Sequence, residues 1–473
     1  MRPVPRVQLF RQSHLWQAHR ASASFDGVSA IATPIPPITR HYGQPFAFFF
    51  DRTQPPAWSF AGSRPVRQLV VEADGTLRLW SRQRWRTLAR PPLEAIAAFV
   101  RADEARPQGL PEWWDERTAI PRTAGYFAYE LGRFAEAVPP AGFDPVGLPL
   151  AVLSTYAAVD AWHPASGRRV HVVFEDAGAA SPPPLAAPTP RGRPRRVSYR
   201  AAFERIQRAI AAGEIYQANL SRRIEIESPG DPLACYLRLR ARQPVPWGAF
   251  LDFGGFQLLS NSPECFLSVA GEEIRTFPIK GTRPRHLDPQ LDARMRAELL
   301  ADEKERAEHL MIVDLERNDL GRVCRIGSIE VPQLYRIETY ATLHHLVSEV
   351  RGKLRPGVGL DEILGATFPG GSITGAPKIR AMEIIAEVEP SDRGVYTGAL
   401  GWMNGERHVQ LSIAIRTAVV ARGRVFYGTG GGIVADSNLA AEYRETELKA
   451  VAFRDALASG GFESNREAFG QAR

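Results

Sequence analysis

Two pairs of glutamates in the C-terminal half of the chain have the spacing of neighbours on one helix face. Glu305 and Glu308 lie in DEKERAEHLMIVDLERNDLG, and Glu442 and Glu445 lie in EYRETELKA. Residues at i and i+3 project from the same side of a helix. Two such pairs facing each other could hold a hard divalent cation, and Mg²⁺ suits carboxylate oxygens. The alternative is a solvated face with ion pairs such as Glu445 with Lys449.

Lysine is rare in this chain, which draws attention to Lys280 in TFPIKGTRPR. All but five of the 59 Lys and Arg residues are arginine, and the five lysines all lie in the C-terminal half. A desolvated ammonium group can lose its proton and attack a carbon atom, whereas a guanidinium cannot. Lys280 is therefore a candidate nucleophile. A GC-rich genome would also explain the excess of arginine, but not the clustering of the lysines.

A candidate general acid lies in SPECFL. Glu264 follows Pro263 and precedes an apolar run, so we expect its carboxyl group to be partly buried. A partly desolvated carboxyl group has a raised pKa and can donate a proton near neutral pH. The alternative is a hydrogen-bonded turn residue without a chemical role.

A first glycine-rich segment, YGTGGGIVADS, lies between a predicted strand and a predicted helix. It resembles a dinucleotide fingerprint only loosely, because the helix starts several residues too late. The backbone N–H groups of Gly430 to Gly432 could instead surround a carboxylate. A bulge or tight turn is the alternative interpretation.

A second glycine-rich segment is FPGGSITGAPKIRAMEII. Gly370 and Gly375 have the spacing of a P-loop, but Ala376 stands where the P-loop lysine belongs, so that interpretation fails. The segment predicts a tight loop that leads into a helix with Pro377 at its first position. The N-terminal N–H groups of that helix could face an anion.

The elements that position these residues form two regions. Residues 1–176 predict short strands with few helices: RQLVVEADGTLRLW as a hairpin, PLEAIAAFVRAD as a helix, and AVLSTYAAVDAWHPASGRRVHVVFE as two strands. Residues 177–196 are rich in Pro and Ala and predict an exposed linker.

Residues 197–459 form the second region, followed by a tail over 460–473. SYRAAFERIQRAIAAGEIYQANL predicts a helix, and WGAFLDF, FQLLS, CFLSVA and EEIRTFPI predict strands. Further helices are expected over 288–319, 377–387 and 438–457, with GALGWMN, VQLSIAIRTAVV and RVFYGTG as strands. Hairpins that alternate with long helices indicate an α+β protein, a large layered fold with mostly antiparallel sheets packed between helices.

Composition limits the class of protein. The 473 residues suffice for two or three domains or one interleaved domain, and no apolar run is long enough for a membrane span or a signal peptide. Cys235, Cys265 and Cys324 make no metal or disulfide pattern, so we expect a reducing, cytoplasmic setting. The net charge of +7 comes from dispersed arginines, which favours a small anionic substrate over nucleic acid.

Taken together and in this order, the segments resemble the chorismate-utilising enzymes. The resemblance rests on GEIYQANL, SPECFL, PIKGTRPR, DEKERAEHLMIVDLERNDLG, GSITGAPKIRAMEII, TGALGW, AIRT, GTGGGIVADS and EYRETELKA, and it covers about Val197 to Ala458. WSFAG and GYFAYELGR extend it more loosely into the first region. The family includes anthranilate synthase component I, aminodeoxychorismate synthase component I, and the isochorismate and salicylate synthases.

Two positions distinguish branches of this family. Isochorismate-type enzymes carry a lysine base where this chain has Gln217, and anthranilate synthases usually carry alanine where it has Lys280. PIKGT is similar to the aminodeoxychorismate synthase branch, which makes 4-amino-4-deoxychorismate from chorismate and ammonia, towards 4-aminobenzoate and folate. Anthranilate synthase component I and a non-catalytic anion-binding module are the alternatives.

The resemblance also implies roles for residues. It implies Mg²⁺ held by Glu308 and Glu445 with Glu305 and Glu442 beside them. It implies that Glu264 protonates the departing 4-hydroxyl, that Lys280 attacks C2, and that ammonia then adds at C4 and expels the lysine. The residues expected to contact or line the substrate site are Gln217, Gly281, Thr282, His345, Tyr396, Arg416, Thr429, Gly430, Gly431, Gly432 and Lys449.

The source of ammonia is expected to be another protein. None of the three cysteines lies in the G-x-C-x-G turn of a class-I glutaminase, so the resemblance implies a separate glutamine amidotransferase subunit. A fused lyase is not expected after the last helix. Relatives with a tryptophan pocket usually have Ser after an acidic residue, whereas here Arg52 follows Asp51, which leaves tryptophan binding open.

Overall fold

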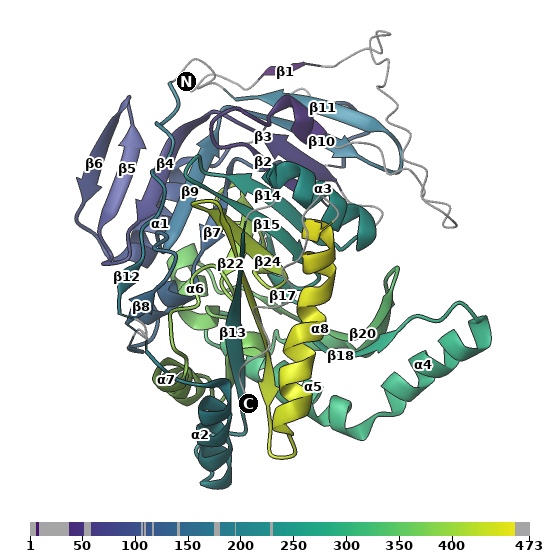
Figure 1. Ribbon diagram of the computed structural model, residues 1–473. Coiled ribbons are helices and arrows are strands. Elements are labelled where there is room, and N and C mark those ends of the chain that lie inside the picture. The colour runs from purple at the N-terminus through teal and green to yellow at the C-terminus, as the bar shows by residue number, and fades with distance from the viewer. Residues whose placement is uncertain are drawn as a thin grey trace.

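Two large antiparallel sheets form the centre of the molecule (Figure 1). The computed structural model describes residues 6–8, 37–51, 58–105, 107, 110–115, 118–139, 142–174, 180–193, 195–227 and 230–458. Within this part of the chain every pairing between named strands is antiparallel, which confirms the predicted α+β class.

The first sheet contains, in spatial order, β1 (Arg6–Gln8), β11 (Arg168–Val173), β10 (Ala158–His163), β3 (Ser59–Gly62), β2 (Phe48–Asp51), β14 (Trp247–Asp252), β15 (Phe256–Ser262), β24 (Thr417–Ala421), β25 (Arg424–Ile433), β13 (Gln217–Glu227) and β21 (Gly375–Ala376). The second contains β18 (Ile279–Pro284), β20 (Leu343–Lys353), β17 (Glu273–Thr276), β16 (Cys265–Ala270), β23 (His408–Ile413), β22 (Ala399–Met403), β7 (Thr123–Phe127), β9 (Ala151–Tyr156), β4 (Pro65–Val71), β5 (Leu77–Ser81) and β6 (Arg84–Leu88). β19 (Glu330–Thr339) pairs with β20 beside this path, and β8 (Phe143–Asp144) pairs with β12 (Arg191–Gly192).

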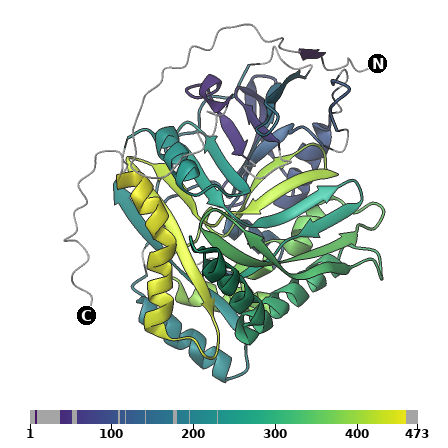
Figure 2. The ribbon, with the colours of Figure 1, turned by 90° about the vertical axis from the view of Figure 1, so that its right-hand side faces the viewer.

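Helices cover the outer faces and ends of the sheets. They are α1 (Pro92–Ala102), α2 (Tyr199–Ala211), α3 (Pro232–Arg242), α4 (Pro289–Ala301), α5 (Glu303–Gly321), α6 (Leu360–Thr367), α7 (Lys378–Val388) and α8 (Leu439–Ala458), with 3₁₀ turns η1 (Pro37–Arg40), η2 (Tyr129–Phe134) and η3 (Gly371–Ile373). Side chains of Asp231 and Asp302 cap the first turns of α3 and α5. Figures 1 and 2 both show α8 lying along β25.

The inner faces of the two sheets share one core, so neither sheet is independent of the other. Aromatic side chains meet across the interface: the rings of Phe60 and Trp402 lie 5.5 Å apart, and those of Phe48 and Tyr156 lie 4.5 Å apart. The two regions predicted from the sequence contribute strands to both sheets, and the boundary between them is therefore not a boundary in space.

The proline-rich segment between the regions lies on the first sheet over its described part, 180–193. Its residues are mostly exposed, but Leu185 forms an isolated bridge with Gly254, and Arg422 donates to the carbonyl of Pro188. Residues 177–179 and the predicted tail over 460–473 lie outside the described residues.

Four local expectations need correction. The segment 151–175 forms three strands, because Ala157 separates β9 in one sheet from β10 in the other. The helix expected to reach Leu220 ends at Ala211, and β13 begins at Gln217. The apolar run 409–420 is broken before Thr417, where the chain crosses from the second sheet to the first.

The fourth correction concerns the glycines at 430–432, which lie within β25 rather than in a loop. They pair with Ser221, Leu220 and Asn219 of β13. A Cβ on Gly430 would lie 2.6 Å from the carbonyl oxygen of Leu220, so glycine permits this close approach. The strand predicted over 424–430 is present, but its continuation to Ile433 was not predicted, because glycines without side chains carry no alternating pattern. The strands β18, β19 and β20 and helix α6 were also not predicted.

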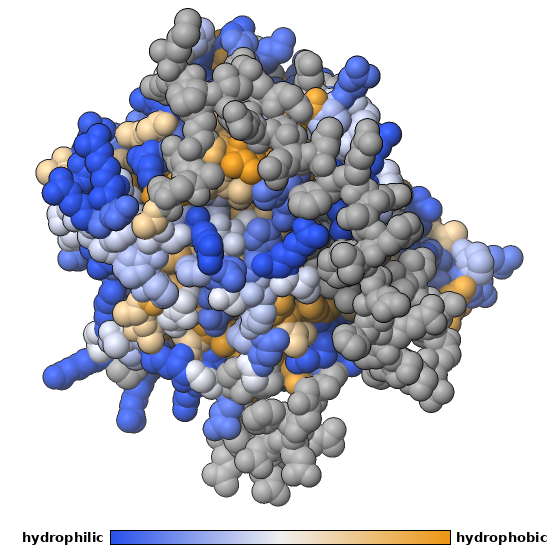
Figure 3. Space-filling model, turned by 90° about the horizontal axis from the view of Figure 1, so that it is seen from above, coloured by the Kyte–Doolittle hydropathy of each residue, from blue (hydrophilic) through white to orange (hydrophobic). Residues whose placement is uncertain are grey.

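The described residues that are visible from above are mainly hydrophilic, with small hydrophobic patches (Figure 3). Among the described residues, no helix combines the length and the apolar character needed to cross a bilayer.

A buried ion pair attaches α3 to the first sheet. Asp51 at the end of β2 is 1% exposed, and its carboxylate accepts hydrogen bonds from Arg240 of α3 and from Ser59 at 3.0 Å. The carboxylate of Asp51 is thus already paired within this chain. Arg52 lies outside the described residues.

We predict that Asp51→Ala destabilises the protein by about 3–5 kcal/mol, because it leaves the Arg240 guanidinium buried without its partner. Arg294→Ala is the control, since it breaks the exposed pair with Glu298 and should cost less than about 0.5 kcal/mol. Urea unfolding followed by tryptophan fluorescence measures both. Equal midpoints for the two variants would contradict the proposed role of the buried pair.

Candidate active site

Lys280 lies in β18, paired with Leu346 of β20. Its side chain keeps partial exposure, but protein atoms surround the ammonium group closely, and this burial lowers the pKa of Lys280. The negative charges of Glu308 and Glu264 raise the pKa of Lys280, whereas the positive charge of Lys449 lowers it further. The candidate nucleophile, the candidate acid and one predicted metal ligand therefore share one electrostatic neighbourhood.

A bulge next to Lys280 shapes this neighbourhood. Gly281 interrupts the register between β18 and β20 and has a φ of +73°. A Cβ there would lie 2.9 Å from Cδ1 of Leu299 and 3.2 Å from Oε2 of Glu305, so the position requires glycine on both counts. Beyond the bulge, Thr282 and Nδ1 of His345 are hydrogen-bonded at 2.9 Å.

Glu264 lies immediately before β16, with 4% of its surface exposed. Burial raises the pKa of its carboxyl group to about 7, although a hydrogen bond from Ser372 Oγ at 2.7 Å and the positive charge of Lys280 both oppose this. A carboxyl group with this pKa is partly protonated at neutral pH, which is the state a general acid needs.

The two glutamate pairs lie on α5 and α8, as their spacing predicted, and the pairs influence each other. Burial raises the pKa of Glu308, and Glu305 and Glu442 add to this, whereas Lys280 and Lys304 oppose it. Burial also raises the pKa of Glu442, with Glu445 adding to it. Repulsion between carboxylates on different helices indicates that the two pairs face a common space.

Several of these oxygens have protein partners. Glu445 forms an ion pair with Lys449 at 2.6 Å, Glu442 accepts from Ser437 at 2.7 Å, and Glu305 accepts from Arg283 at 3.4 Å. The Lys449 pair outweighs burial and lowers the pKa of Glu445. In the described part of the chain, no group of three or more His, Cys, Asp or Glu side chains is close enough together to hold a metal ion.

β25 presents two different faces to the site. On the face toward α8, the hydroxyl of Thr429 donates to the Thr446 carbonyl at 2.9 Å, and a Cβ on Gly431 would lie 3.3 Å from Oε2 of Glu442. On the other face, a Cβ on Gly432 would lie 3.0 Å from the side chain of Gln217. Gly431 and Gly432 have no side chains, so β25 lies between Glu442 and Gln217 without a side chain filling the space next to either residue.

Gln217 is fully buried, and neither its Oε1 nor its Nε2 has a hydrogen-bond partner. A buried amide without partners costs free energy unless a ligand satisfies it. This unpaired amide points to a polar ligand beside Gly432.

Two further candidates lie at strand ends. Arg416 stands at the crossover between β23 and β24 with a φ of +49°, and burial lowers its pKa, whereas Tyr427 and Glu264 oppose this. Burial lowers the pKa of His345 to about 3, and Arg416 adds to this, so His345 is neutral at physiological pH.

Tyr396 packs over Gly428, where a Cβ would lie 2.1 Å from the ring, and burial raises its pKa. Lys449 of α8 donates to the carbonyl of Gly430 in β25 at 2.8 Å and pairs with Glu445 of its own helix. Its ammonium group therefore lies between α8 and β25.

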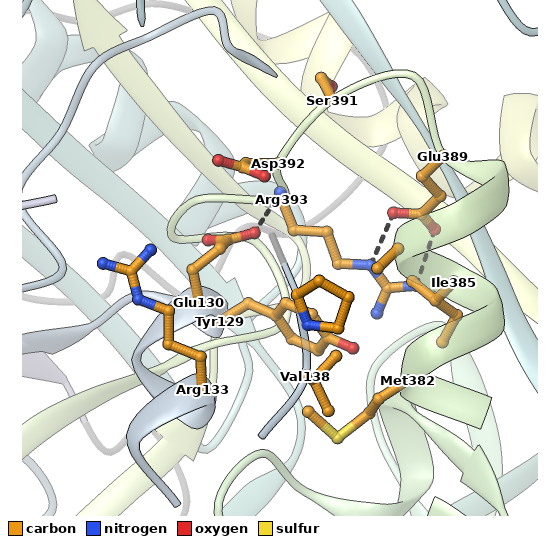
Figure 4. A pocket seen from close by; sticks show the side chains of 12 residues that line it. Tyr129, Glu130, Arg133, Val138, Met382, Ile385, Glu389, Ser391, Asp392 and Arg393 are labelled. Atoms are coloured by element: carbon orange, nitrogen blue, oxygen red, sulfur yellow. Dashed lines mark hydrogen bonds and ion pairs between the residues drawn. The ribbon is translucent and has the colours of Figure 1, made fainter. Parts of the chain in front are cut away.

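A separate pocket is lined by Tyr129, Glu130, Glu389 and Arg393, among others, and by none of the candidate site residues named above (Figure 4). Its wall contains the buried pair Arg393–Glu389, at 2.7 Å, and Arg393 also donates to the carbonyls of Ile373 and Asn219. Glu389 accepts from both the backbone and the hydroxyl of Ser221. This pair therefore ties the end of α7 to η3 and β13, which carry Ser372 and Gln217.

Sequence reasoning missed three contributors to the site. The loop GGSITGAP was noticed, but its role was assigned to a helix N-terminus, whereas it provides the Ser372 hydroxyl to Glu264. His309 follows Glu308 in the acidic segment; its Nε2 bonds Ser348 at 2.6 Å, its Nδ1 has no partner, and burial lowers its pKa to about 4. The Arg393–Glu389 pair has no signal beyond its i,i+4 spacing.

Comparisons with known proteins agree with this arrangement. The chain is 40% identical to the anthranilate synthase component 1 of Streptomyces coelicolor over 77% of each chain, and 36% identical to the aminodeoxychorismate synthase component 1 of Salmonella typhimurium over 81% of this chain and 86% of that protein. The crystal structure of anthranilate synthase component I from Streptococcus pneumoniae superposes with a TM-score of 0.72 and 28% identity, covering 91% of this chain and all of that one.

The sequence profile of the chorismate binding enzymes matches residues 46–455. The chain therefore belongs to the chorismate binding enzyme family. Its relatives include proteins named as both anthranilate synthase and aminodeoxychorismate synthase, so the comparisons establish the family and not the branch.

We predict that Gly281→Ala lowers the turnover of chorismate by about a hundredfold, because the added methyl group displaces Leu299 and Glu305 beside Lys280. Gly271→Ala is the matched control. Gly271 has a φ of +64° but no atom within 4 Å of its added Cβ, so it has the same backbone strain without the contact. Equal activities for the two folded variants would show that the contact with Glu305 is unimportant.

Proposed function

We propose that the protein is an aminodeoxychorismate synthase, which converts chorismate and ammonia to 4-amino-4-deoxychorismate. The observation that carries this proposal is the setting of Lys280, a rare lysine whose pKa is lowered by burial beside Glu264 and Glu308. A lysine in such a setting is neutral more often than an exposed one, and a neutral amine can act as a nucleophile.

The proposed reaction uses two of the chain's own groups in sequence. Protonated Glu264 donates its proton to the 4-hydroxyl of chorismate, which leaves as water, while the Lys280 amine forms a bond to C2 and the ring double bonds shift. Ammonia then forms a bond to C4, the double bonds return, and the bond between C2 and Lys280 breaks to release the neutral amine. The new C4 ammonium group passes a proton to the Glu264 carboxylate, which restores the acid. Dividing one difficult displacement into two steps is the general benefit of a covalent nucleophile.

The surrounding residues support binding of a dianionic substrate. Arg416 and Lys449 provide positive charge on the two sides of the site, and neutral His345 can donate or accept a hydrogen bond. The unpaired amide of Gln217 provides a neutral polar group where a general base would be needed to activate water. An amide at that position favours ammonia over hydroxide as the incoming nucleophile.

The proposal includes Mg²⁺ because the candidate ligands are carboxylate oxygens, which this cation prefers. Glu305, Glu308, Glu442 and Glu445 offer only carboxylate oxygens, and a divalent cation drawn between the two helices would relieve the repulsion between them. Glu308 and Glu445 are the proposed direct ligands. When bound, Mg²⁺ would act as a Lewis acid toward a substrate carboxylate.

Anthranilate synthase component I is the second candidate function. The 40% identity to a protein of that name over 77% of the chain favours it. The two candidates share the fold and the acidic pairs, and they differ in whether Lys280 forms a bond to the substrate. A separate glutamine amidotransferase is the proposed source of ammonia in either case, since Cys235, Cys265 and Cys324 are all buried.

Product analysis distinguishes the candidates directly. We predict that the purified protein with chorismate, Mg²⁺ and an ammonium salt at alkaline pH forms 4-amino-4-deoxychorismate, detected by chromatography and by its conversion to 4-aminobenzoate with an added lyase. Anthranilate and pyruvate as the main products would favour the second candidate. Binding of chorismate without any product would indicate a non-catalytic anion-binding module.

We predict that EDTA abolishes this activity and that Mg²⁺ restores it. Glu308→Gln and Glu445→Gln should each raise the Mg²⁺ concentration for half-maximal activity by at least about tenfold, because each removes a charged ligand. Glu298→Gln, on the exposed surface of α4, is the control and should leave the Mg²⁺ dependence unchanged. Full activity in EDTA would rule out the metal site.

A further inference from the structure

We infer that Tyr335, Ser348 and His309 are positioning residues: they hold the start of α5, which carries the first glutamate pair, against β18, which carries the candidate nucleophile. The inference rests on the proposed role of that glutamate pair at a metal site. The three residues come from β19, β20 and α5. They therefore join three elements around one part of the site.

Tyr335 has an unusual backbone conformation for a tyrosine in a strand. Its φ is +61°, and the register between β19 and β20 shifts between Gln333 and Arg336, so the residue lies in a bulge. Residues with side chains rarely adopt the left-handed region, and they remain there only where the surrounding contacts fix them. The contacts of this bulge supply that constraint.

The backbone and the side chain of Tyr335 bind different elements. The backbone N–H donates to Oγ of Ser348 in β20 at 3.0 Å. The hydroxyl donates to the carbonyl of Arg306 in α5 at 3.2 Å, and the Arg306 guanidinium lies 4.9 Å from the centre of the tyrosine ring. The bulge thus connects β20 with the first turns of α5.

Ser348 is the centre of this connection. It is 1% exposed, and its backbone N–H donates at 3.2 Å to the carbonyl of Pro278, two residues before Lys280. Its hydroxyl group, which accepts from Tyr335, is also hydrogen-bonded to Nε2 of the fully buried His309 at 2.6 Å. A hydroxyl group has one donor and two acceptor sites, so it can make both bonds at once.

The residues held in this way are direct neighbours of the first glutamate pair. Arg306 follows Glu305, and His309 follows Glu308. His309 also lies one turn after Glu305 on the same face of the helix. Rotation or translation of this part of α5 would therefore move both carboxylates, and the contacts described above oppose such a motion.

The same part of α5 also lies against the strand of the nucleophile. A Cβ on Gly281, the residue after Lys280, would lie 3.2 Å from Oε2 of Glu305. Leu346, two residues before Ser348, pairs with Lys280 in the ladder between β18 and β20. The start of α5 is therefore held at two separate points, one beside β18 at Gly281 and one beside β20 at Ser348.

The consequence for metal binding follows from this arrangement. Carboxylates bind a cation best when other residues already hold their oxygens in place, and loss of such a residue typically weakens metal binding by about 10–100-fold. Removal of the Ser348 hydroxyl releases β19 and α5 together, because both are bonded to it. A role limited to packing would lower stability and leave the metal affinity of the folded protein unchanged.

The test measures the binding of Mn²⁺, which prefers the same oxygen ligands as Mg²⁺ and is counted in its free form by electron paramagnetic resonance. Titrations contain chorismate but no ammonium, so that amination cannot occur. We expect Ser348→Ala to weaken Mn²⁺ binding by at least about tenfold. Ser154→Ala is the matched control, because Ser154 in β9 is also fully buried and also accepts an N–H, from Gln68 at 2.9 Å. Five strands of the second sheet lie between β9 and β20.

Tyr335→Phe tests the same claim with a milder change, because it removes only the hydroxyl group that binds the carbonyl of Arg306. Its control is Tyr126→Phe, since Tyr126 in β7 donates to the carbonyl of Pro149 at 3.0 Å. We expect Tyr335→Phe to weaken Mn²⁺ binding by a smaller factor than Ser348→Ala, and Tyr126→Phe to leave it unchanged. Urea unfolding shows that each variant is folded under the conditions of the titration.

Wild-type affinity for Mn²⁺ in folded Ser348→Ala and Tyr335→Phe would overturn the inference, as would an equal loss in the two controls. Absence of Mn²⁺ binding by the wild type would overturn it together with the metal site. The measurement does not depend on which product the enzyme forms. Weakened binding in the two variants would support the inference even if the product analysis gave anthranilate, a result that would contradict only the proposed function.

Discussion

The partial removal of water from the Lys280 ammonium group is the interaction on which the rest of the site depends. An ammonium group surrounded by protein loses hydration, and this shifts its equilibrium toward the neutral amine. Glu308 and Glu264 oppose the shift by favouring the charged ammonium form. In the proposed mechanism the neutral amine is the form that attacks the substrate. The bulge at Gly281 lies next to Lys280 in the chain, and the charges of Glu308, Lys449, Glu264 and Glu445 act on its ammonium group.

The two sheets and their helices explain how such a neighbourhood can be rigid. Lys280 comes from the end of the second sheet, Gln217 and the glycines come from the first, and the carboxylates come from α5 and α8. The shared aromatic core holds the sheets against each other, and the Arg393–Glu389 pair connects η3, β13 and α7 behind the site. Mutually packed elements therefore fix the relative positions of groups that lie more than 200 residues apart in the chain.

Local sequence patterns predicted many of the helices and hairpins, whereas the elements and contacts that depend on long-range pairing were not predicted. The spacing of Glu305 with Glu308 and of Glu442 with Glu445 predicted helices α5 and α8, and the alternation around Asp74-Gly75 predicted the β4–β5 hairpin. The strand predicted over 424–430 continues to Ile433, and this extension was missed because glycines carry no hydrophobic alternation; the extension pairs with β13. The contact of Ser372 with Glu264 joins residues 108 positions apart, which no local pattern can predict.

The central claim is that Lys280 forms a bond to the substrate, and peptide mass spectrometry tests it most directly. Protein quenched during incubation with chorismate and Mg²⁺ in the absence of ammonium is digested with trypsin, which cannot cleave after a modified lysine. The account predicts the uncleaved segment Thr276 to Arg285 carrying a chorismate-derived mass, absent from Lys280→Ala and lost from the wild type when ammonium is added. An unmodified segment in wild-type protein that is forming aminated product, or full activity in Lys280→Ala, would contradict it.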